Sequence, residues 1–109
     1  EAATEKEDVK RLVFKALIPE LKPSCVVASN TSSISITRLG AATDRPEKFI
    51  GMHFMNPVPV MKLVEIINGY ATKKEVTTTS ANAWEELTFD YSAIDASKSY
   101  QKIVLIQYY

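Results

Sequence analysis

The chain has 109 residues, which is enough for one domain with a modest hydrophobic core. Hydrophobic residues make up 46% of it and charged residues 24%, as in an ordinary globular protein. The 13 basic residues balance the 13 acidic ones, so charge gives no reason to expect a nucleic acid or an anionic membrane as partner. No apolar run approaches the roughly 20 residues that a membrane-spanning helix needs.

The cysteine and histidine content bears on the compartment and on metal chemistry. Cys25 is the only cysteine, so no internal disulfide can form, which is typical of a reducing compartment. We therefore expect a cytoplasmic protein, or a mitochondrial one if the source is eukaryotic. One thiol and one imidazole do not make a zinc site, and we predict no metal. Because Cys25 lies in an apolar run, we predict that it is a buried packing residue.

The first predicted element is an amphipathic helix. Thr4 and Glu7 have the spacing of a capping box, with Thr4 as the N-cap and Glu7 reaching back to it. The apolar residues that follow are spaced by three and one, which predicts one buried face with Lys10 on another face. These apolar residues are Val9, Leu12, Val13, Ala16 and Leu17. Because no strand precedes this helix, we expect that the N-terminal part of the domain is missing.

A short apolar run at residues 25–29 predicts a buried strand, and four small polar residues follow it. These are Asn30, Thr31, Ser32 and Ser33. In parallel α/β sheets, ligands bind outside the carboxyl ends of the strands, so this cluster is well placed for a ligand. A turn followed by the N-cap of a short helix at residues 35–42 would also explain the serines and threonines, and the two interpretations are compatible.

The remaining elements alternate strands with connections. Residues 49–54 and 61–67 predict two strands, joined by a stiff proline-rich turn at residues 56–59. A helix is predicted over residues 73–87 and a last strand over residues 103–106. The order of helices and strands predicts an α/β layered domain with a partly parallel sheet.

The only histidine, His53, lies at the end of one predicted strand, and Glu65 lies inside the next. Neighbouring strands would bring the two side chains together. A carboxylate against one ring nitrogen fixes the tautomer and leaves the other nitrogen free to act as a base. From spacing alone the more common interpretation is structural, because an isolated histidine beside aromatic residues usually plays no part in catalysis.

Two motifs carry a resemblance to a known family. The first is Asn30-Thr31-Ser32-Ser33, and the second is H-F-M-N-P-V-P-V-M-K-L-V-E, which runs from His53 to Glu65. Together they resemble the 3-hydroxyacyl-CoA dehydrogenase family, including bacterial 3-hydroxybutyryl-CoA dehydrogenases. The resemblance covers residues 1–72. It implies a partial Rossmann-like fold, with an incomplete sheet and helices packed on it.

The resemblance also implies a reaction and roles for individual residues. Members of the family oxidise the hydroxyl of an L-3-hydroxyacyl-CoA to a ketone and pass hydride to NAD, or run the reverse. His53 matches the catalytic base, Glu65 the carboxylate that orients it, and Ser32 the serine beside the substrate oxygen. The residues matching the family's NAD-binding positions are Glu5, Lys10, Asn30, Ser32 and Asn56.

The departures from the family limit what this chain is expected to do alone. The family opens with a G-x-G-x-x-G turn that binds the pyrophosphate, whereas the three glycines here lie far apart. It also continues into a helical domain that completes the acyl-CoA site. Residues 1–72 thus match the second half of the NAD-binding domain, and residues 73–109 form a divergent tail. We expect a dehydrogenase fragment that is inactive alone, and the alternative is a non-enzymatic module that forms homo-oligomers through an exposed sheet edge.

Overall fold

The computed structural model describes residues 1–61, 63–77 and 102–107, and the account below concerns these residues. The predicted helix over residues 73–87 can therefore be compared with the structure only at its start. Residues 74–77 are helical, as predicted, and the rest of that element lies outside the described residues. Residues 78–101, most of the predicted divergent tail, also lie outside the described residues.

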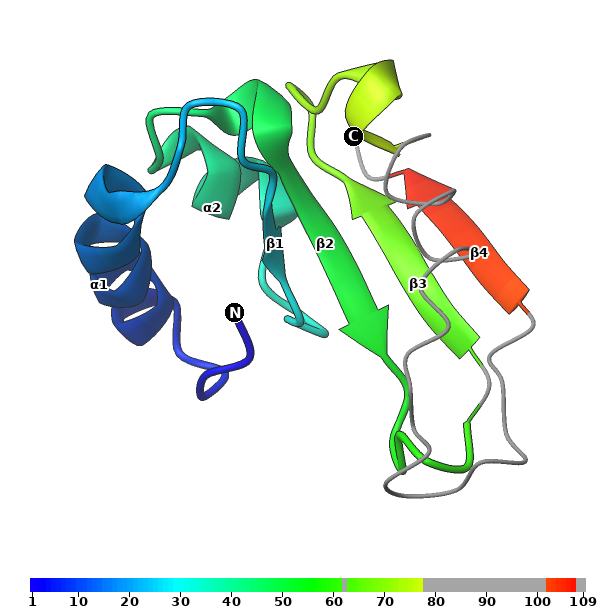
Figure 1. Cartoon of the computed structure of the whole chain (residues 1–109). Helices are drawn as coiled ribbons and strands as arrows, with labels where there is room; N and C mark the ends of the chain where they lie inside the picture. Colours follow the sequence, from blue (N-terminus) through cyan, green and yellow to red (C-terminus); the bar gives the residue numbers. More distant parts are fainter. Residues whose placement is uncertain (62, 78–101, 108–109) are drawn as a thin grey trace.

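The described strands form one mixed sheet in the order β1-β2-β3-β4 (Figure 1). They are β1 Val27–Ser29, β2 Phe49–Phe54, β3 Leu63–Asn68 and β4 Lys102–Gln107. β1 runs parallel to β2, β2 antiparallel to β3, and β3 parallel to β4. The predicted partly parallel α/β architecture is confirmed, and the tail strand β4 joins the same sheet.

Two α-helices cover one face of this sheet: α1 Glu7–Leu17 and α2 Ile36–Ala41 (Figure 1). Short 3-10 turns follow α1 at Ile18–Glu20 and precede β2 at Pro46–Lys48. The core between helices and sheet consists of Phe14, Ile18, Val27, Ile36, Leu39, Phe49 and Ile67. Side chains alternate along a strand, so a second cluster occupies the other face. It contains Ile50, Val64, Ile66 and Val76, with Ala28, Met52 and Phe54 packed against it.

The predicted start and buried face of the first helix are both wrong. The N-cap of α1 is Lys6, and no side chain caps it, because Glu7 instead accepts hydrogen bonds from Arg11. The buried residues of α1 are Lys10 and Phe14, whereas the predicted face residue Leu12 is 67% exposed. The helix is therefore rotated relative to its apolar pattern, and the burial of a charged Lys10 is the reason.

Cys25 is only partly buried, so its predicted role as a buried packing residue is wrong. The strand begins later than predicted, at Val27, and Cys25 lies in the loop before it. The short helix over residues 35–42 is confirmed as α2, and Ser35 caps it by accepting a hydrogen bond from the Arg38 amide.

Gly51 allows a close approach in the middle of β2. An added Cβ there would lie 2.8 Å from Cβ of Ile67 and 3.0 Å from Cδ1 of Ile36. The absence of a side chain lets α2 and β3 pack against β2 at this point. This packing fixes the strand two residues before His53.

Candidate active site

The register of β2 and β3 places His53 directly opposite Glu65. The Nδ1 atom of His53 lies 2.8 Å from Oε2 of Glu65, and each side chain is 20% exposed. The predicted juxtaposition is therefore present, and it follows from the pairing of two regular strands. Cross-strand neighbours of this kind are held by the whole ladder rather than by their own contact.

This contact determines which nitrogen of the ring can act. A carboxylate beside Nδ1 favours the tautomer with hydrogen on that atom, which leaves the Nε2 lone pair available as a base. Alternation along β2 puts His53 on the same face as Phe49 and Gly51, the face covered by the helices. The dyad thus faces the side of the sheet that carries α1 and α2.

The turn after β1 is held by the carboxylate of Glu5. Oε1 of Glu5 accepts hydrogen bonds from the backbone amides of Ser32 and Ser33, both at 3.2 Å, and from the Ser33 hydroxyl at 3.1 Å. The Thr31 hydroxyl donates to the same oxygen. Burial acts to raise the pKa of Glu5, but these hydrogen bonds and the Lys10 ammonium outweigh it and hold the pKa below its ordinary value.

A buried ion pair lies behind this turn. Nζ of Lys10 is 2.9 Å from Oε1 of Glu1 and 3.7 Å from Oε2 of Glu5. The side chains of Lys10 and Glu1 are only 1% and 2% exposed. Ser29 donates a hydrogen bond of 2.6 Å to Oε2 of Glu1. Burial acts to raise the pKa of Glu1, yet the hydrogen bonds from Ser29 and Lys10 outweigh it and the pKa is lowered.

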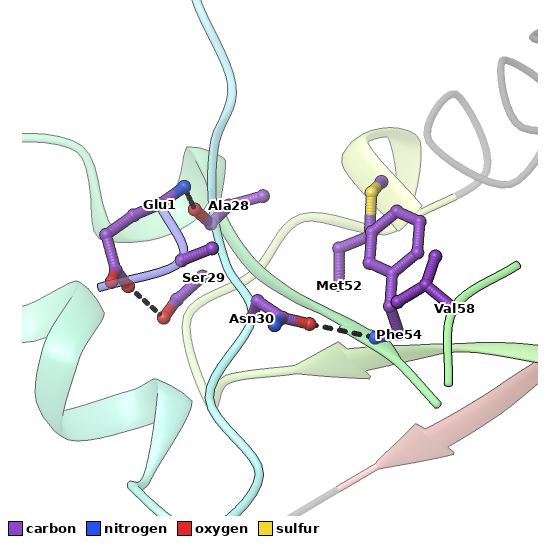
Figure 2. Close-up of a pocket in the computed structure, with 8 residues that line it drawn as sticks. Glu1, Ala28, Ser29, Asn30, Met52, Phe54 and Val58 are labelled. Carbon is purple, nitrogen blue, oxygen red and sulfur yellow. Dashed lines mark hydrogen bonds between the residues drawn. The ribbon is translucent and has the colours of Figure 1, made fainter. Parts of the chain in front are cut away.

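The two asparagines that match cofactor positions lie in different settings. Oδ1 of Asn30 accepts a hydrogen bond from the Phe54 amide at 2.9 Å, which ties the end of β1 to the end of β2 (Figure 2). Asn56 is exposed in the turn after β2, where its peptide bond to Pro57 is cis. Asn30 is therefore fixed to Phe54, the residue that follows His53 in the chain, whereas Asn56 lies at the surface.

Two pockets flank the ends of β1 and β2. One of about 290 Å³ is lined by the turn and the start of α2, including Ser32, and by Ile67, which shares a strand face with Glu65. The other, of about 360 Å³, is lined by Glu1, Ala2, Ala28, Ser29, Asn30, Met52, Phe54 and Val58 (Figure 2). Met52 and Phe54 alternate with His53, so this larger pocket opens on the opposite face. The smaller pocket is therefore the one on the face of the dyad.

Comparisons with known proteins identify the family. The model of the family "3-hydroxyacyl-CoA dehydrogenase, NAD binding domain" matches residues 1–94. The chain belongs to the 3-hydroxyacyl-CoA dehydrogenase family. NAD is the cofactor of that family, and the predicted Rossmann-like fold is confirmed by structures of its members.

Individual relatives are similar over different lengths. The 3-hydroxybutyryl-CoA dehydrogenase of Bradyrhizobium diazoefficiens is 69% identical over 72 residues, 66% of this chain and 25% of the relative. That of Clostridioides difficile is 45% identical over 103 residues, 94% of this chain and 32% of the relative. The crystal structure of (S)-3-hydroxybutyryl-CoA dehydrogenase from Ralstonia eutropha matches with a TM-score of 0.83 and 38% identity, covering 98% of this chain and 34% of the other. The chain thus spans about a quarter to a third of these relatives.

The polar side chains of Glu5 and Asn30, near the end of β1, fit part of the family's cofactor. Oε2 of Glu5 faces Lys10, and the hydrogen bonds from the turn go to the other oxygen, Oε1. Oε2 is therefore suited to accept a hydrogen bond from a ribose hydroxyl. Asn30 adds a side-chain amide at the same end of the sheet. Within the described residues no glycine has a positive φ, as a phosphate-binding glycine turn would require. The described residues therefore offer a carboxylate acceptor for a ribose hydroxyl, and none of their glycines has the backbone conformation of a pyrophosphate-binding turn.

Sequence reasoning missed two residues of this cluster, Glu1 and Ser29, and it named Thr31 in the polar cluster without predicting its contact with Glu5. The signal available was a lysine inside an apolar helix with glutamates five and nine residues before it. Within the described residues no group of three acidic, histidine or cysteine side chains is arranged to bind a metal ion. The described helices are all too short or too polar to cross a bilayer.

Proposed function

We propose that this chain carries the proton-transfer residues of an NAD-dependent L-3-hydroxyacyl-CoA dehydrogenase of fatty acid metabolism, together with part of its NAD-binding site. The observation that supports this most strongly is the 2.8 Å contact between His53 and Glu65 on paired strands, in a member of this family. The reaction converts a 3-hydroxyacyl-CoA to a 3-ketoacyl-CoA, or runs in reverse.

The proposed chemistry assigns one task to each of three side chains. Nε2 of His53 takes the proton of the substrate's 3-hydroxyl, while Glu65 holds the ring through Nδ1 and stabilises the charge that forms on it. The Ser32 hydroxyl donates a hydrogen bond to the same substrate oxygen as it becomes a carbonyl. NAD supplies the acceptor for the hydride that leaves C3 of the substrate. Atoms and charges balance, since the alcohol loses one proton to His53 and one hydride to the cofactor.

The residues proposed to contact the cofactor are Glu5, Lys10, Asn30, Ser32 and Asn56. Of these, Asn30 is fixed beside β2, and Glu5 keeps one carboxylate oxygen outside the turn. Lys10 is 1% exposed, so we propose that it acts mainly by holding Glu5 in place. We propose no pyrophosphate contact from the described residues.

We propose that residues 1–72 form the second half of an NAD-binding domain and that residues 73–109 form a divergent tail. A match of 69% identity over 72 residues supports the first part. Because the 109 residues span only about a quarter to a third of these relatives, we propose that they bind NAD weakly and do not turn over acyl-CoA on their own. Activity should therefore be measured with this segment inside a complete enzyme.

The test is a chimera in which residues 1–72 of this chain replace the corresponding segment of the Bradyrhizobium relative. We expect the chimera to reduce acetoacetyl-CoA with NADH, followed by absorbance at 340 nm. His53→Ala should lower kcat by about 100-fold to 10,000-fold, because it removes the acid–base group. Glu65→Gln should cause a smaller loss, and Glu20→Gln, the same change at an exposed site, should cause none. A folded chimera without activity, or His53→Ala with unchanged kcat, would contradict the proposal.

Self-association through the edge of β1 is the competing proposal. The outer edge of β1 is only three residues long, and Glu1 already occupies part of it. The N-terminal ammonium of Glu1 donates a hydrogen bond to the Ala28 carbonyl at 2.9 Å, and the Glu1 carbonyl accepts one from the Asn30 amide at 2.8 Å. We therefore expect a monomer in sedimentation equilibrium. A dimer that dissociates on substitution of Val26 by lysine would favour the competing proposal.

A further inference from the structure

Glu5 is a proposed cofactor contact that also binds the turn carrying Ser32. The Ser32 amide, the Ser33 amide and hydroxyl, and the Thr31 hydroxyl all donate to its Oε1. These donors are 26 to 28 residues away in the chain, so the contact joins the loop before α1 to the loop after β1. One oxygen atom therefore fixes the backbone of Ser32, which lines the smaller pocket on the face of the dyad.

We propose that Glu5 is a positioning residue for Ser32, acting on the substrate oxygen through the turn rather than mainly by binding the cofactor. This inference rests on the proposed function, because it takes Ser32 as the hydroxyl that contacts the substrate.

The division of labour between the two oxygens of Glu5 supports the proposal. Oε1 is occupied by four donors, and a carboxylate oxygen offers about two lone pairs, so no further donor fits there. Oε2 faces the Lys10 ammonium at 3.7 Å. A ribose hydroxyl could therefore bind only Oε2. The hydrogen bonds from the turn to Oε1 would form with or without the cofactor.

The buried ammonium of Lys10 helps to fix the position of the Glu5 carboxylate. Lys10 is fixed by Glu1 at 2.9 Å and by the Ala3 carbonyl at 3.2 Å, so its ammonium has a single position. Ser29 in turn fixes Glu1 from the end of β1. The position of the Ser32 turn thus depends on a series of contacts that begins at Ser29 on β1 and ends in the turn that follows this strand.

The first test uses the complete chain and needs no activity. The backbone amide signals of Ser32 and Ser33 are followed by ¹H–¹⁵N NMR from pH 7 down to pH 3. We expect both to titrate together, because protonation of Glu5 removes their acceptor, and at a pH below the ordinary pKa of glutamate. The charged groups beside Glu5 are Lys10, whose Nζ lies 3.7 Å from Oε2 of Glu5, and Glu1 on the far side of Lys10.

Two variants separate Glu5 from its neighbours in this titration. Glu5→Gln should abolish the shared titration at Ser32 and Ser33, although Glu1 is still present. Glu7→Gln, a glutamate at the start of α1 that contacts Arg11 and Arg38 instead, should leave it unchanged. Amides of β2 and β3 report that each variant is folded. A titration that persists in Glu5→Gln would overturn the proposal.

The second test is a double-mutant cycle between Glu5→Gln and Ser32→Ala in the chimera. Ser32→Ala should lower kcat by about 100-fold. Glu5→Gln alone should lower kcat by about 10-fold through misplacement of Ser32, a larger factor than the rise in the Kd of NADH caused by the altered Oε2 contact. In the Ser32→Ala background, Glu5→Gln should have no further effect on kcat.

Additive losses, or a loss expressed in the Kd of NADH with kcat unchanged, would overturn the positioning role and place Glu5 on the cofactor. Failure of the proposed function itself would look different, since His53→Ala would then leave kcat unchanged. The two proposals can therefore fail separately.

Discussion

The His53–Glu65 pair and the Glu5 cluster are both held by hydrogen bonds, but in different ways. The first joins residues 12 apart on adjacent strands, and the register of β2 and β3 sets it. The second joins loops up to 28 residues apart and depends on buried charge for its geometry. The position of the His53–Glu65 pair is thus set by strand pairing, whereas that of the Glu5 cluster is set only by charge pairing. The two parts of the site should therefore respond differently to substitution.

The largest expected effect on stability comes from removing the cation beneath the Glu5 cluster. Lys10→Met keeps the apolar stem but leaves Glu1 buried without its partner, since the Glu1 side chain is 2% exposed. We expect a loss of about 3–5 kcal/mol in the free energy of unfolding, measured by urea denaturation.

The matched control for this change is the double variant Lys10→Met with Glu1→Gln, which leaves no buried carboxylate at position 1 without a cation. It should recover part of the loss. If the single and the double variant fold, the contact between His53 and Glu65 should persist in each, because the pairing of β2 with β3 sets it. An equal loss in single and double variants would show that burial of charge is not what matters at Lys10.

The next effect concerns the half of the site that the strands determine. Gly51→Ala places a Cβ 2.8 Å from Cβ of Ile67, so the strands must separate or the side chains must shift. We expect a loss of about 1–3 kcal/mol, measured by urea denaturation. Gly69→Ala, where the nearest atom would be 3.2 Å away, should cost less. The reverse order would mean that close packing at β2 does not support the site.

The smallest effect is a difference in acid sensitivity. Hydrogen bonds lower the pKa of Glu1 and Glu5 in the folded chain, so their contribution to stability is present above the ordinary pKa of glutamate. That contribution is lost as the pH falls through the lowered values. Glu5→Gln should therefore reduce the loss of stability between pH 7 and pH 3, whereas Glu20→Gln should not. Thermal unfolding at a series of pH values measures both.

Sequence reasoning predicted the part of the molecule in which local pattern and tertiary structure agree. The apolar run at residues 49–54 predicted the bounds of β2, and two adjacent strands were enough to bring His53 to Glu65. Ser35 was recognised at the start of a short helix because its capping role is local.

The part that could not be predicted depends on contacts between distant loops. The apolar spacing of the first helix placed Leu12 inside, yet Leu12 is 67% exposed and Lys10 is buried. Only the carboxylate of Glu1 makes burial of that lysine favourable, and periodicity carries no information on such a pairing. The role of Glu5 in the Ser32 turn was missed for the same reason.

The measurement that tests the central claim most directly is ¹⁵N NMR of the imidazole ring. His53 is the only histidine, so histidine labelling gives one pair of ring signals that need no assignment. At about pH 9, where a free imidazole is neutral, we expect the proton on Nδ1 and an unprotonated Nε2. Glu65→Gln should shift the ring toward a mixture of tautomers, and Glu20→Gln should not. A ring protonated mainly on Nε2 in the unaltered chain would contradict the assignment of His53 as the base.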